Sequence, residues 1–164
     1  MKSSRARRAS WQAVWLAAFL ILGTLPASAA GEPLVGRWLL KSQQVSGQES
    51  AARPLTLDIR PVGDAFEFEY SVPLNQSRTV SLRFVARLDG TAGEVKDAQG
   101  RKIGTAKVMR GGALEYLVTL EGPNRPTASG RMKLSADRGT LVCDSDSVAP
   151  GGAKTHTVQV FTRQ

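Results

Sequence analysis

Residues 66–72 read Phe-Glu-Phe-Glu-Tyr-Ser-Val, a stretch in which apolar and polar side chains alternate at every position. Successive side chains of a β-strand point to opposite faces of a sheet, so this pattern predicts a strand with one dry face and one wet face. A helix would instead place its apolar residues three and four positions apart. The aromatic side chains are therefore expected to point inward, with Glu67 and Glu69 as solubility charges on the wet face.

The same alternation continues through most of the chain on either side. Apolar residues occupy every second position in four further stretches, at residues 55–59, 80–88, 114–120 and 132–134. Glycine-containing turn signals such as Asp89-Gly90 separate these stretches, and glycine tolerates the backbone conformations of tight hairpins. No convincing amphipathic helix follows residue 31. The sequence therefore predicts an all-β fold, an antiparallel up-and-down meander of about nine or ten short strands.

A meander of this kind must cover one apolar face of every strand, and it does so by closing into a barrel or folding into a sandwich. We favour a barrel of about 8–10 strands, because closure also removes exposed strand edges. The predicted inward positions are almost wholly apolar, and two of them, Ala86 and Gly130, are small. Such a barrel can be filled by its own side chains or can hold one small ligand. We expect a pocket that is open toward one loop end and bounded by Phe66, Phe68, Phe84 and Tyr116.

The first thirty residues predict a secretory signal peptide. Four basic residues within positions 2–8 form a charged head, residues 13–22 form an apolar run, and the segment ends in Ala27-Ser28-Ala29-Ala30. The apolar run is shorter than the ~20 residues of a bilayer-spanning helix, although an uncleaved membrane anchor is an alternative. We predict cleavage after Ala29 or Ala30. The domain of residues 31–164 would then be exported to the periplasm or the extracellular space, with no stable membrane span.

Removal of residues 1–30 changes the charge balance of the protein. The full chain carries 22 basic and 14 acidic residues, a net charge of +8, and four of the basic residues lie in the predicted leader. The remaining 18 basic and 14 acidic residues give a net charge of +4 without any run of five like charges. Domains that bind nucleic acid usually show a clustered basic face, so no nucleic-acid partner is expected.

One pair of residues could carry nucleophilic chemistry. Cys143 is the only cysteine, so it cannot form an internal disulfide. If the last turn is centred on residues 149–151, Cys143 lies across from His156, Thr157 or Val158. A thiol beside an imidazole is the minimum for a Cys-His nucleophile. Since no third group is evident to orient His156, we expect a buried thiol beside a chance neighbour and no catalytic residue.

Asp144 and Asp146 have the spacing of oxygen ligands in a calcium-binding loop. Such a loop also requires a glycine at its sixth position and a glutamate at its twelfth, where this chain has Ala149 and Thr155. We therefore interpret the two aspartates as part of a solvated loop and expect neither a metal nor a cofactor.

Gly36-Arg37-Trp38, near the start of the predicted domain, resembles the Gly-x-Trp opening of the lipocalin and fatty-acid-binding superfamily. The chain is more closely similar to small secreted bacterial lipocalin-like proteins, through Lys41-Ser42, Gly104-Thr105 and the aromatic closing strand at 158–164. The Thr-Asp-Tyr motif and the disulfide of typical lipocalins are missing from the sequence.

The resemblance implies that Gly36 and Trp38 open the first strand of a barrel whose first and last strands are neighbours. Because burial of an indole is strongly stabilising, we expect Trp38 to plug the closed end of this barrel, although it could instead line a ligand cavity. The guanidinium of Arg163 could stack on its ring or lie in a solvated terminus. Gly36, Trp38 and Arg163 are thus candidate structural residues.

The leading hypothesis for function is a non-enzymatic barrel of the cell envelope or the secreted space that binds a small apolar ligand. The alternative is a protein-interaction or inhibitor module that works through its loops. A third hypothesis is a small hydrolase built on Cys143 and His156. The sequence identifies neither the ligand nor a protein partner.

Overall fold

The computed structural model describes residues 31–51, 53–75 and 77–164. The predicted signal peptide and its cleavage site lie outside these residues. Within them the chain forms eleven β-strands and no α-helix, which confirms the all-β prediction. No stretch of the described residues forms a helix with the length and apolarity of a membrane span. The strands are β1 (Gly36–Val45), β2 (Gln48–Ser50), β3 (Thr56–Val62), β4 (Ala65–Asn75), β5 (Arg78–Ala86), β6 (Gly93–Asp97), β7 (Lys102–Gly112), β8 (Glu115–Glu121), β9 (Thr127–Leu134), β10 (Thr140–Val148) and β11 (Lys154–Arg163).

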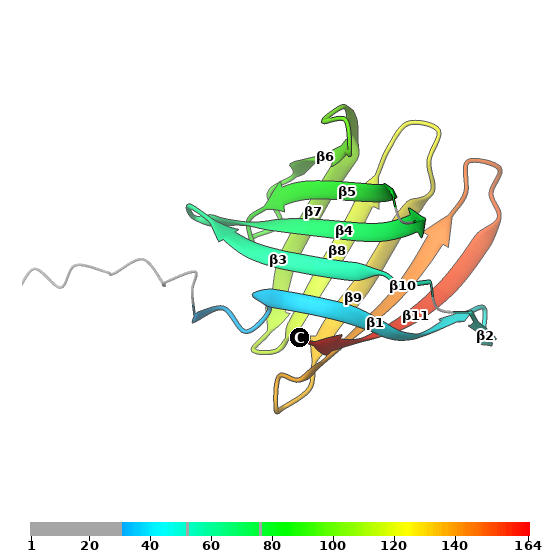
Figure 1. Ribbon diagram of the computed structural model, residues 1–164. Helices are drawn as coiled ribbons and strands as arrows, with labels where there is room; N and C mark the ends of the chain where they lie inside the picture. Colours follow the sequence, from blue (N-terminus) through cyan, green and yellow to red (C-terminus); the bar gives the residue numbers. More distant parts are fainter. Residues whose placement is uncertain (1–30, 52, 76) are drawn as a thin grey trace, which may run out of the picture.

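Ten of these strands form a closed antiparallel barrel. Each strand from β3 to β11 pairs with its neighbour in the sequence, and β1 pairs with both β3 and β11. β2 is an additional short strand that pairs with Gln43–Val45 of β1. In Figure 1 the strands β3, β4 and β5 cross in front of β7 and β8, as expected for a closed and strongly tilted sheet. The predicted up-and-down meander closed into a barrel is confirmed.

The period of two predicts most of the inward-facing side chains correctly. Leu57, Phe68 and Tyr116, on three different strands, are all fully buried, and the described residues include no buried charged residue. Val80 is an exception, because its side chain is 49% exposed. It lies at the start of β5, where three consecutive residues are exposed, so the β4–β5 hairpin extends beyond the packed interior.

The alternating strand directions give the barrel two distinct ends. The start of β1 lies at one end, together with the β3–β4, β7–β8 and β9–β10 turns, and we call this the Trp38 end. The β4–β5, β8–β9 and β10–β11 turns lie at the opposite end, which we call the far end.

Candidate functional site

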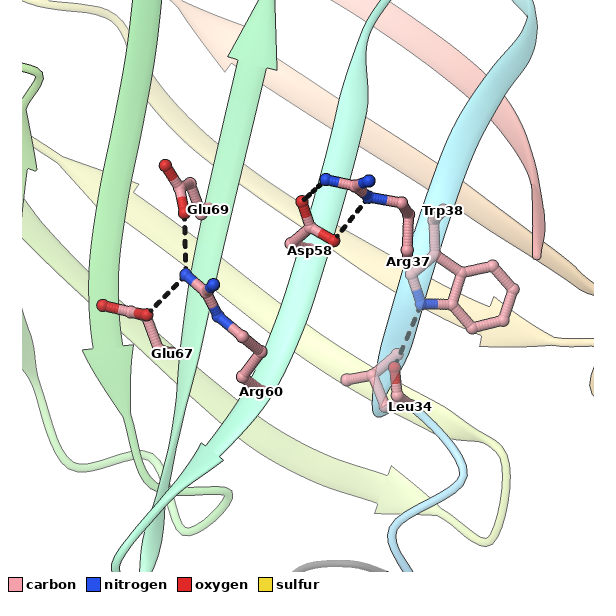
Figure 2. A network of polar contacts seen from close by, with 7 residues as sticks. All are labelled: Leu34, Arg37, Trp38, Asp58, Arg60, Glu67 and Glu69. Carbon is pink, nitrogen blue, oxygen red and sulfur yellow. Dashed lines mark hydrogen bonds and ion pairs between the residues drawn. The ribbon is translucent and has the colours of Figure 1, made fainter. Parts of the chain in front are cut away.

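Trp38 closes one end of the barrel. Its side chain is fully buried, and the indole Nε1 donates a hydrogen bond to the carbonyl oxygen of Leu34, 3.1 Å away (Figure 2). Leu34 is itself buried and precedes β1, so the segment that leads into the barrel covers its end. A buried indole N–H needs an acceptor, and this segment supplies it. The predicted plug at this end of the barrel is confirmed.

Arg163 holds the plug and the leading segment together. Its guanidinium carbon lies 4.2 Å from the centroid of the Trp38 ring, and the two residues face each other across the β1–β11 pair. Nη1 donates a hydrogen bond to the carbonyl oxygen of Val35 and Nη2 to that of Pro33, each at 2.6 Å. Burial lowers the pKa of Arg163, with a smaller contribution from Arg138.

The guanidinium of Arg163 explains the glycine of the Gly-x-Trp motif. A Cβ atom on Gly36 would lie 2.5 Å from Nη1 of Arg163, closer than atoms can pack. Gly36 also has a φ of 150°, which residues with a side chain rarely adopt. Any larger residue here would therefore displace the arginine or distort the start of β1.

A second polar cluster, which the sequence did not predict, lies at the same end. The hydroxyl of Tyr116 donates a hydrogen bond to one carboxylate oxygen of Glu32, and Arg110 donates one to the other oxygen. Burial raises the pKa of Tyr116 well above its ordinary value, and the Glu32 carboxylate raises it further. The hydroxyl of Tyr116 is therefore bound to the segment that closes the Trp38 end.

The predicted pocket residues form an aromatic layer inside the barrel. Phe66, Phe68, Phe84 and Tyr116 are all buried in the core. The rings of Phe68 and Phe84 stack with centroids 4.8 Å apart and an interplanar angle of 11°, so these two side chains fill space against each other. Their predicted contact with a ligand stays a prediction.

A cavity of about 200 Å³ lies next to this layer, toward the far end. Its wall includes Tyr70 and Leu82, which pair with each other two residues beyond the stacked phenylalanines. The four aromatic residues that the sequence predicts are not among its lining residues. The wall is formed mainly by the inward side chains of six strands, including Tyr70, Leu82, Val118, Leu120, Met132, Cys143 and Gln159.

The cavity opens toward the far end of the barrel. An adjoining hollow of about 230 Å³ shares Leu82, Leu120 and Ala128 with it and extends to Arg125 in the β8–β9 turn. Gly130 also lines the cavity, and a Cβ there would lie 2.4 Å from the carbonyl oxygen of Asp144. The missing side chain thus permits β9 and β10 to approach closely.

The predicted pairing of Cys143 with His156 is wrong. Cys143 pairs with Gln159, and His156 pairs with Asp146, because Gly152 adopts a left-handed conformation and the turn is centred on residue 151. Cys143 faces the cavity, whereas His156 lies on the outer face. Burial raises the pKa of the Cys143 thiol to about 12, so it is protonated at neutral pH.

Asp144 and Asp146 lie on β10, not in a loop as predicted. Both are exposed on the outer face, and Nδ1 of His156 lies 2.9 Å from a carboxylate oxygen of Asp146. The described residues contain no group of three or more acidic, histidine or cysteine side chains arranged to hold a metal ion.

The outer face near β1, β3 and β4 carries ion pairs. Arg60 donates hydrogen bonds of 2.8 Å to both Glu67 and Glu69, and Arg37 binds both carboxylate oxygens of Asp58 (Figure 2). The predicted wet-face position of the two glutamates is confirmed. These charges point away from the cavity.

No protein-family model matches the chain, and no curated protein sequence matches it. Similar folds occur among solved structures. Zebrafish ileal bile acid-binding protein, solved in complex with cholic acid, is 20% identical; the match covers 80% of this chain and 99% of that chain, with a TM-score of 0.51. The chain folds as a lipocalin-like barrel. Bovine odorant-binding protein with its natural ligand is 14% identical over 81% of this chain and 72% of that chain, with a TM-score of 0.45.

Proposed function

We propose that this lipocalin-like barrel binds a small apolar ligand in the cavity beside its aromatic layer. The observation that carries the proposal is a cavity of about 200 Å³ whose wall is mostly apolar. An apolar guest that enters such a cavity leaves water and gains van der Waals contacts with the apolar wall. The complex of the zebrafish protein with cholic acid supports a binding role for a barrel of this type.

The size of the cavity limits the ligand. It exceeds the roughly 150 Å³ of an engineered apolar cavity that holds benzene, and it is below the roughly 300 Å³ at which pockets for drug-sized ligands begin. A single ring or a medium-length chain fits this space. The adjoining hollow, at about 230 Å³, gives a longer chain room toward the far end.

We also propose that the protein acts by binding and not by catalysis. The Cys-His nucleophile that the sequence made conceivable does not form, because the two side chains lie on opposite faces of the sheet. The buried thiol of Cys143, with its pKa raised to about 12, also lacks the thiolate that a nucleophile requires. Export through residues 1–30 is likewise part of the proposal and rests on the sequence of that segment.

Uptake of a neutral apolar fluorophore tests the binding proposal. N-phenyl-1-naphthylamine, whose three rings occupy the cavity together with the adjoining hollow, should brighten on mixing with the domain of residues 31–164. A Val118→Phe variant should lower its affinity at least about tenfold, because the added ring occupies the cavity that Val118 lines. Thr119→Phe is the matched control, since the next residue of β8 faces outward and leaves the cavity unchanged.

Circular dichroism and thermal unfolding should show that both variants are folded. Absence of fluorophore uptake by the wild-type domain would contradict the binding proposal. The protein-interaction module acting through its loops would then be the better hypothesis.

A further inference from the structure

The hydroxyl of Tyr70 is a polar group in the cavity wall without a hydrogen-bond partner among the described residues. Tyr70 lines the cavity beside Leu82, and burial raises its pKa well above the ordinary value, with a smaller contribution from Cys143. The other tyrosine, Tyr116, has its hydroxyl bound to Glu32. The described residues include no buried side-chain oxygen or nitrogen that lacks a partner, so this hydroxyl is accessible to water in the open cavity, and a ligand that supplies a partner there replaces that water with a direct hydrogen bond.

The other polar side chains that face the cavity either have hydrogen-bond partners already or are weak donors. The amide Nε2 of Gln159 donates a hydrogen bond of 2.9 Å to Oε1 of Gln43. The hydroxyl of Ser145 donates to the carbonyl oxygen of Thr157 at 3.4 Å. The thiol of Cys143 is a weak donor. Tyr70 is therefore the group in the wall that is best placed to bind a polar atom of a guest.

No charged side chain of the described residues points into the cavity. Arg131 and Asp144 contribute to its wall, but Nε of Arg131 lies 3.2 Å from Glu115, and the Asp144 carboxylate lies 3.6 Å from His156. Both side chains are more than half exposed on the outer face. A carboxylate inside the cavity would thus lose its hydration and gain no counter-charge, which is strongly unfavourable.

We propose that the ligand is a neutral molecule with a single hydroxyl or carbonyl group, which forms a hydrogen bond with the Tyr70 hydroxyl. Its apolar remainder packs against Leu82, Val118 and Met132. This inference rests on the proposed binding function and narrows its ligand class. A carboxylate ligand would have to bind differently, with its apolar tail in the cavity and its carboxylate near Arg125 at the mouth. The experiments below distinguish this arrangement from a neutral ligand bound to Tyr70.

Displacement of N-phenyl-1-naphthylamine by three ligands of equal chain length tests the ligand class. At pH 8, 1-octanol and 2-octanone should displace the fluorophore, and octanoate should bind at least about a hundredfold more weakly because it is ionised. Octanoate that binds within threefold of octanol would overturn the inference and leave the binding function standing. Absence of fluorophore uptake by the wild type would overturn both.

The variant Tyr70→Phe tests the hydrogen bond. It should weaken the binding of 1-octanol about fivefold to tenfold and leave the affinity for the fluorophore unchanged. The fold should be retained, since the hydroxyl has no partner in the described protein. Ser71→Ala, which removes a hydroxyl from the opposite face of the same strand, should change neither affinity. Unchanged octanol binding by Tyr70→Phe, or octanoate binding that depends on Arg125 in an Arg125→Gln variant, would overturn the inference.

Discussion

The guanidinium carbon of Arg163 lies 4.2 Å from the centroid of the Trp38 ring, and the two residues face each other across the strands that close the barrel. The same guanidinium binds the carbonyl oxygens of Pro33 and Val35. One side chain therefore connects three parts of the molecule, namely the β1–β11 seam, the buried tryptophan and the leading segment. Because the barrel closes only through this seam, these contacts contribute to the stability of the whole sheet.

We predict that Arg163→Ala lowers the free energy of unfolding by about 2–4 kcal/mol. The stack on Trp38 contributes roughly 0.5–2 kcal/mol, and three carbonyl oxygens, those of Pro33, Val35 and Arg138, lose charged donors. Urea unfolding followed by tryptophan fluorescence measures this change, since Trp38 is the only tryptophan of residues 31–164. The emission of the folded variant should also shift to longer wavelength as water reaches the ring.

Arg37→Ala is the control for this change. Arg37 precedes Trp38 on β1, but its guanidinium lies on the outer face with Asp58 and is 64% exposed. Exposed ion pairs contribute little to stability, so the unfolding midpoint and the emission maximum should stay close to those of the wild type. If both substitutions lowered the free energy of unfolding equally, the stack of Arg163 on Trp38 and its hydrogen bonds would contribute no more to stability than an exposed ion pair.

The alternation of residues 66–72 sufficed to predict the strands and their inward faces, because side-chain direction in a sheet depends on parity alone. It could not predict which layer of the barrel is hollow. That depends on how the strands tilt and on where large side chains fill the interior, as Phe68 and Phe84 do from the neighbouring strands β4 and β5. The predicted pocket and the observed cavity therefore lie one layer apart along β4 and β5.

Two other features depend on information that no local pattern carries. The mispairing of Cys143 and His156 arose from the turn at residues 149–153, where the left-handed Gly152 sets a register different from the assumed one. A shift by one residue exchanges the faces of a strand. The contact of Glu32 with Arg110 and Tyr116 joins residues far apart in the sequence, and only the closed fold brings them together.

Both tyrosines of the chain, Tyr70 and Tyr116, have a pKa raised above the ordinary value near 10, mainly by burial. We predict that absorbance at about 295 nm shows no phenolate in the folded domain at pH 10–11. In about 6 M urea, which unfolds most small domains, both should titrate near pH 10. Phenolate formation with full amplitude in the folded domain at pH 10 would contradict the buried placement.

The same shifts determine how stability depends on pH. A folded-state pKa above the unfolded value means that the folded domain retains a proton that the unfolded chain loses. The stabilising contribution is complete below about pH 9–10, and it decreases as the pH rises through the window toward the folded pKa values. Cys143, with its pKa raised to about 12, contributes in the same direction. The midpoint temperature of thermal unfolding should therefore decrease as the pH is raised from about 9 to about 11.

We predict that the exported protein begins at Ala30 or Gly31, after removal of the preceding leader. The small residues Ala27 to Ala30 satisfy the requirement of the cleaving peptidase at either position. Expression of the full chain in a bacterial host, followed by intact mass measurement of the exported fraction, identifies the first residue. A mature chain that still contains Trp15 would instead support an uncleaved anchor.

The last prediction separates the aromatic layer from the cavity. Phe84→Leu should lower the free energy of unfolding by about 1–2 kcal/mol, because it removes the stacked partner of Phe68 from a filled part of the core. Its effect on fluorophore affinity should be small, within about threefold, since Phe84 does not line the cavity. Val118→Phe should show the converse, with affinity reduced at least about tenfold and stability nearly unchanged. A folded Phe84→Leu variant that loses the fluorophore would place the ligand against the four aromatic residues, because only direct contact would then explain the loss.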